Sequence, residues 1–195
     1  MMRGFILALS FCFPLVPPAV AGGPVGRMLG FFDSLRQAGR EQEAHRAVPH
    51  VEARFADGEV NEYLSYALKT APRPGVKSIR IDCADGNYIA TTVVADLDAL
   101  DRWKPGTIPF ALRWALSGIK TLRVDLRFRQ TTDRLVGLSV EKAYYQDLRI
   151  PAWLVQEMMS ILAARQPEHY DTSHLTLPMG LRRMWTTGHS ISAMN

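Results

Sequence analysis

Cysteine is scarce in this sequence, with only two in 195 residues. Two thiols cannot build a disulfide scaffold or a four-cysteine zinc site. After the N-terminus no uncharged apolar run reaches eighteen residues, which excludes a polytopic membrane protein. Neither sign of charge dominates, because 23 Lys and Arg face 19 Asp and Glu. The resulting charge of +4 is too small to indicate nucleic-acid binding.

Catalytic signatures are also missing. The sequence has no Gly-x-Ser-x-Gly elbow, phosphate-binding loop, dinucleotide glycine fingerprint or His-Glu-x-x-His helix. Cys83 falls on the inward phase of a predicted strand, which favours a buried structural thiol over a nucleophile. Residues 168–174 hold two His and two acidic residues, but their spacing matches no closed metal site. We therefore predict a protein that is not an enzyme and has no cofactor or metal.

The first 21 residues resemble an export signal. Arg3 precedes the apolar residues 4–13, and after three prolines the chain reaches Ala19-Val20-Ala21. A basic start, a short apolar stretch and small residues at the end predict a secretory signal peptide cleaved near Ala21, hence a periplasmic or secreted protein. A retained N-terminal anchor is the alternative. Cleavage would leave 195 − 21 = 174 residues with one cysteine and no internal disulfide.

Residues 22–50 form the second predicted unit. Apolar side chains recur on one helical face over residues 25–35, and residues 36–50 are polar and mixed in charge. This pattern predicts a short amphipathic helix that leads into a polar linker. The helix could lie on a membrane or pack on its own domain.

Residues 51–195 are predicted to form a single α+β domain. Asp57 is a candidate N-cap for one amphipathic helix, and Pro151 starts a second. Alternating apolar residues and turn signals predict hairpins between them, including an Asp85-Gly86 turn. The sequence thus predicts a curved antiparallel sheet of hairpin-connected strands with the two helices on its concave face.

The strand over residues 122–129 has one apolar and one charged face. Its charged face carries Arg123, Arg127 and Arg129, in a segment (residues 102–134) with eight basic and two acidic side chains. A solvated outer strand face is one interpretation. The other is contact with the anionic head groups of lipids.

Three short motifs resemble those of envelope proteins with tubular lipid-binding (TULIP-type) domains. They are Asp57-Gly58-Glu59-Val60-Asn61-Glu62-Tyr63-Leu64, Arg149-Ile150-Pro151-Ala152-Trp153-Leu154-Val155 and Leu177-Pro178-Met179-Gly180-Leu181. LmeA-like and AsmA-like periplasmic proteins are nearest in pattern. The resemblance implies binding or transport of a lipid or lipid-linked glycan, without catalytic residues. This sequence departs from the pattern at Asp57 and Gly58, where a Thr and an acidic residue are usual.

The candidate lipid-binding residues are inward positions of the two helices and a central strand: Leu64, Leu68, Leu126, Leu154, Met158 and Leu162. The same residues could simply fill a core. Two hypotheses therefore follow: a lipid-binding domain with an apolar groove, or an envelope scaffold or interaction domain with no ligand. In the first, the partners are a lipid or lipid-linked glycan and an anionic membrane surface. Nucleic acid is not expected, because export would remove the protein from the cytoplasm.

Overall fold

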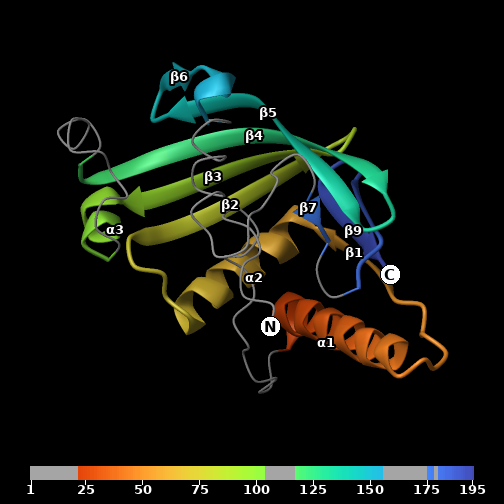
Figure 1. The fold of residues 1–195 in the computed structure, drawn as a ribbon. Helices are drawn as coiled ribbons and strands as arrows, with labels where there is room; N and C mark the ends of the chain where they lie inside the picture. The colour runs from red at the N-terminus through yellow and green to blue at the C-terminus, as the bar shows by residue number, and fades with distance from the viewer. Residues whose placement is uncertain (1–21, 104–116, 156–174, 178–179) are drawn as a thin grey trace.

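The computed structural model describes residues 22–103, 117–155, 175–177 and 180–195. They form two antiparallel sheets with helices against them, so the predicted α+β class is confirmed (Figure 1). The long sheet has the order β2-β3-β4-β5-β6, with β7 also paired to β5, and the small sheet has the order β1-β9-β8. The strands of the long sheet are β2 (Val76–Ala84), β3 (Tyr88–Asp96), β4 (Ile119–Thr132), β5 (Leu135–Tyr145), β6 (Leu148–Ile150) and β7 (Leu175–Thr176).

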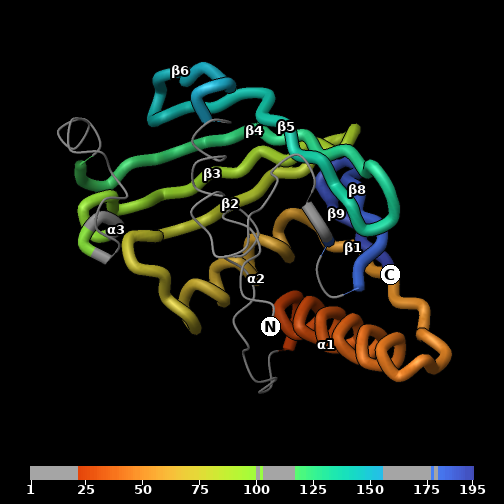
Figure 2. Tube along the Cα trace, in the orientation of Figure 1, coloured from red at the N-terminus to blue at the C-terminus, as the bar shows by residue number. Residues whose placement is uncertain are grey.

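The small sheet consists of β1 (Glu52–Ala56), β8 (Arg183–Thr186) and β9 (Ser190–Met194), and the helices are α1 (Gly23–Glu43), α2 (Asp57–Thr70) and α3 (Leu97–Trp103). The long sheet is curved, and α2 lies on its concave side with α1 beyond it (Figure 2). Residues 152–155, after β6, are helical. No helix among the described residues is long and apolar enough to span a membrane.

The hairpins follow the local sequence signals closely. The β2–β3 hairpin turns at the predicted Asp85-Gly86, and the turn places Gly86 and Asn87 at positive φ, where Gly and Asn are favoured. β8 and β9 also form a hairpin, with Gly188 at positive φ in its turn. The sequence predicts one sheet, however, and the structure has two. The second arises because β1 pairs with β9, a contact between opposite ends of the domain that no local pattern encodes.

α2 places its apolar stripe in the core and its polar side chains against the edge of the long sheet. Val60, Tyr63, Leu64 and Ala67 are buried in the hydrophobic core. The N-cap is Ala56, not Asp57 as predicted, and its N–H donates to Glu59 Oε2 at 2.8 Å. The Asp57 carboxylate is consequently not the cap and is available for a contact elsewhere.

Two of these polar side chains satisfy the free backbone groups of β2, the edge strand. Asn61 Oδ1 accepts from the Ile81 N–H at 2.7 Å, and Asn61 Nδ2 donates to the Ile81 carbonyl at 2.8 Å. Asp57 Oδ1 accepts from the Cys83 N–H at 3.1 Å. Asp57 and Asn61, four residues apart on α2, thus bind Cys83 and Ile81, two residues apart on β2. This arrangement closes an edge that could otherwise pair with another chain.

α1 packs on its own domain. It extends to Glu43, beyond the predicted end near residue 35, and its apolar side chains lie in the same core as those of α2 and the small sheet. Phe31 meets the Phe55 ring edge-on with centroids 5.4 Å apart, and Phe32 lies 5.5 Å from Tyr63. The Arg27 guanidinium sits 5.0 Å above the Phe55 ring and 2.7 Å from Glu59 Oε1. Ala38, in the polar half of the helix, is also buried, so tertiary packing extends beyond the apolar half.

Candidate functional site

The inner face of the long sheet, on which α2 packs, is the main candidate site. One row of side chains crosses it from strand to strand, because residues directly opposite each other point to the same side. The row is Ile79, Val93, Leu122, Tyr145 and Leu148, on β2, β3, β4, β5 and β6. At about 4.8 Å between strands it spans about 19 Å. It is apolar throughout except for the Tyr145 hydroxyl.

Exposure in this row is lowest at the α2 end and highest at the far edge, with Tyr145 partly buried between Leu122 and Leu148. Ile79 is 7% exposed and belongs to the core, Leu122 is 37% exposed, and Leu148 at the far edge is 72% exposed. The helix covers the β2 end of the row, whereas Leu122 on β4 and Leu148 on β6 present apolar side chains to solvent. Sequence alternation predicted the apolar face, but only the strand register shows which part of it is exposed.

The predicted lipid-binding residues fall into different environments. Leu64 is buried in the core, and Leu68 is partly buried against it. Leu126 is buried on β4, whereas Leu154 is 38% exposed. Met158 and Leu162 lie outside the described residues. Leu64, Leu68 and Leu126 thus pack within the protein. The exposed apolar side chains on and after the long sheet include Leu122, Leu148 and Leu154. Leu122 and Leu148 are absent from the predicted set.

The three predicted arginines lie on the opposite, outer face. Arg123 Nε donates to Asp125 Oδ1 at 3.0 Å, and Arg127 Nε lies 3.3 Å from Glu141 Oε1. Arg129 is exposed, and it has no ion-pair partner among the residues that the structure describes. Two of the three charges are therefore balanced within the protein.

The outer face also contains a buried carboxylate that the sequence analysis assigned to the solvated side. The Asp125 side chain is 3% exposed. It accepts hydrogen bonds from Arg123 and from Tyr88, and burial together with the bond to Asp125 raises the pKa of Tyr88 to about 12. The bond to Asp125 also raises the pKa of Arg123. A charged, hydrogen-bonded cluster therefore orders the centre of this face, which strand alternation alone does not predict.

Cys83, Asp57 and His189 meet where the small sheet joins α2 and β2. Asp57 Oδ2 lies 3.2 Å from Nδ1 of the exposed His189 ring, and its other oxygen accepts from the Cys83 backbone. Burial, and then the hydrogen bond to Asp57, raise the pKa of the Cys83 thiol, which keeps it protonated. The carboxylate stands between thiol and imidazole, whereas a nucleophilic triad requires the imidazole in the middle. Cys83 is thus a buried structural thiol, as predicted.

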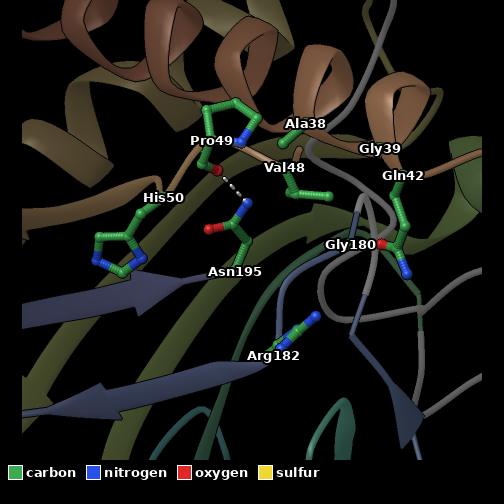
Figure 3. A pocket seen from close by; sticks show the side chains of 9 residues that line it. All are labelled: Ala38, Gly39, Gln42, Val48, Pro49, His50, Gly180, Arg182 and Asn195. Carbon is green, nitrogen blue, oxygen red and sulfur yellow. Dashed lines mark hydrogen bonds between the residues drawn. The ribbon is translucent and has the colours of Figure 1, made fainter. Parts of the chain in front are cut away.

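A pocket of about 210 Å³ with a mixed polar and apolar lining lies between the C-terminal part of α1, residues 48–50 and the chain around residue 180 (Figure 3). Its polar side chains are partly engaged within the protein. Asn195 Nδ2 donates to the Pro49 carbonyl at 3.0 Å, and Gln42 Oε1 accepts from Arg134 Nη2 at 2.8 Å. Ligand pockets usually measure about 300–1,000 Å³. This pocket is too small for a lipid, and the two hydrogen bonds tie neighbouring segments together.

A second pocket, of about 260 Å³, lies at the β5–β6 edge. Its lining includes two exposed cations, Lys142 and Arg149, beside Ile150 and Pro151. Glu141 also lines it, with its carboxylate in the ion pair with Arg127. The two cations face a carboxylate that already has a partner, so the pocket favours an anion.

Metal binding has no support in the described part of the chain, which contains no cluster of three or more His, Cys, Asp or Glu that could hold an ion. The His- and acid-rich residues 168–174 lie outside that part. Comparison of the sequence with family models and curated proteins, and of the fold with solved structures, finds no match.

Proposed function

We propose that this protein is exported to the cell envelope, where it binds or shuttles a lipid or lipid-linked glycan on the inner face of its long sheet, without catalysis. The observation that carries the proposal is the exposed half of the apolar row, from Leu122 on β4 to Leu148 on β6. Leaving such a surface in water costs about 25 cal/mol per Å². An apolar ligand would remove that cost.

The resemblance to TULIP-type proteins adds to this proposal. Its second motif, residues 149–155, spans the end of β6 and the helical residues 152–155, which is the strand-to-helix passage that the resemblance implies. Its first motif spans the start of α2, on the concave side of the sheet. A curved antiparallel sheet with a helix inside the curve suits an elongated apolar ligand.

A scaffold or interaction domain is the second candidate. It is favoured by the burial of Leu64 and by the packing of α1 on α2, which fill the inner face on the β2 side. The two candidates differ in whether the exposed half of the face holds a ligand.

Native mass spectrometry of the protein purified from its own envelope, followed by organic extraction, tests the proposal. We expect a stoichiometric lipid and a protein mass that corresponds to loss of residues 1–21. Leu122→Asp should abolish lipid retention, because it places a charge in the centre of the row. Val48→Asp is the matched control, since Val48 is 39% exposed and lies elsewhere on the molecule. A ligand-free protein that also fails to take up added phospholipid would support the scaffold instead.

A further inference from the structure

Exposed large apolar side chains gather at one end of the molecule. The described residues contain six of them, and all but Val48 belong to the start of β4 or to residues 148–155: Ile119, Leu122, Leu148, Trp153 and Leu154. The Gln146 N–H donates to the Thr121 carbonyl at 2.7 Å, which ties the β5–β6 turn to the start of β4. These five residues, with Lys142 and Arg149, are called the open end.

The open end combines apolar and cationic groups in the way that a membrane surface requires. Trp153 is 70% exposed and Leu148 is 72% exposed. The indole ring of the first and the methyl groups of the second can therefore contact a membrane without any unfolding. Lys142 and Arg149, which line the 260 Å³ pocket, are exposed on the outer face of the sheet, across the β6 edge from Leu148. Tryptophan prefers the boundary between head groups and acyl chains, and Lys and Arg attract anionic lipids.

We propose that the open end docks on a bilayer that contains anionic phospholipid, with Trp153 and Leu148 at the acyl boundary and a lipid phosphate near Lys142 and Arg149. The inference rests on the proposed function and extends it. Because Leu122 and Leu148 belong to both the open end and the apolar row, docking would bring the exposed part of the inner face directly to the membrane. A lipid could then pass between bilayer and sheet without crossing water.

A membrane fits this surface better than a protein partner. The centres of protein interfaces are depleted of lysine, whereas a bilayer surface pairs anionic head groups with an apolar interior. The exposed acid Asp147, in the β5–β6 turn, opposes the attraction. Apolar insertion should therefore supply most of the affinity, with the two cations adding preference for anionic lipid.

Vesicle co-sedimentation of the mature protein tests the docking. We expect binding to vesicles of phosphatidylcholine mixed with phosphatidylglycerol, and weaker binding to phosphatidylcholine alone. Trp153→Ala should weaken binding about tenfold or more, since it removes a large apolar group. Lys142→Gln and Arg149→Gln should each weaken it about fivefold, and Asp147→Asn should strengthen it.

Matched control variants distinguish binding through the open end from binding that depends only on the overall charge or hydrophobicity of the surface. Val48→Ala removes an exposed apolar group from another part of the molecule, and Lys69→Gln removes an exposed cation from α2. Both should bind like the wild type. Docking at the open end is overturned if Trp153→Ala binds unchanged, if Lys69→Gln weakens binding as much as Arg149→Gln, or if inorganic phosphate at constant ionic strength displaces the vesicles.

The outcomes also separate this inference from the proposed function. A lipid that co-purifies from the envelope, combined with no vesicle binding, would overturn the docking and leave the lipid-binding function intact. Vesicle binding that depends on Trp153, combined with a ligand-free protein, would support the docking and overturn the lipid cargo.

Discussion

The two sides of the long sheet's inner face share one strand pattern and differ in what lies against it. On the β2 side, Ile79 packs beneath α2, which in turn packs against α1. On the β6 side, Leu148 occupies the same row and is 72% exposed. Alternation of apolar residues therefore specifies a face, and the elements that pack on it decide whether that face becomes core or surface. The covered side should determine stability and the exposed side binding.

The largest expected effect tests this division directly. Ile79→Ala should destabilise the protein by about 2–5 kcal/mol, because the side chain is buried in the core beneath α2 and its loss leaves a cavity. Leu148→Ala should change the free energy of unfolding by less than about 0.5 kcal/mol. Denaturant titration measures both. If the two substitutions cost the same, the exposed side is as much a part of the core as the covered side.

A smaller effect is expected where α2 closes the sheet edge. Asn61→Ala removes the partner of both the N–H and the carbonyl of Ile81, at a cost of about 2 kcal/mol. Glu62→Ala, at an exposed position of the same helix, is the control. Hydrogen exchange at Ile81 should accelerate in Asn61→Ala alone. Unchanged exchange would mean that packing, rather than the Asn61 side chain, protects this edge.

Local sequence signals predict the parts of the fold that depend on neighbouring residues. Strand alternation and the Asp85-Gly86 turn give the β2–β3 hairpin, and the 3.6-residue period gives α2. The polar half of α1 is not predicted, since its helical state depends on packing. The pairing of β1 with β9 connects residues more than 130 positions apart.

The candidate site was also predicted only in part, because the exposure of its residues depends on packing and strand pairing rather than on local sequence. Alternation places Leu126 on the apolar face, but it cannot tell Leu122, which is exposed, from Phe128, which is buried. Leu148 lies in the same row only because of the register of the β5–β6 hairpin, and that register follows from pairing rather than from periodicity. Asp125 shows the converse case, in which a residue in the charged phase of a strand is buried by its partners.

The smallest expected effect concerns the outer face, where burial depends on polar contacts. Burial and the bond to Asp125 raise the pKa of Tyr88 from 10.0 to about 12, so the folded protein keeps this proton after the unfolded chain has lost it. Stability should therefore fall as the pH rises from about 10 to 12. Tyr88→Phe should reduce that slope and cost about 1 kcal/mol at neutral pH, the value of one hydrogen bond.

Denaturant titration across this pH range distinguishes Tyr88 from its neighbours. Tyr144→Phe, on the same outer face, should leave more of the alkaline slope in place. Equal slopes in the two variants would mean that Asp125 does not hold the Tyr88 proton. Phenolate absorbance, measured in the folded protein, provides the independent check, because Tyr88→Phe should remove an absorbance change centred near pH 12. The outer face would then be stabilised by a small, pH-dependent contribution, whereas the covered inner face depends on apolar packing.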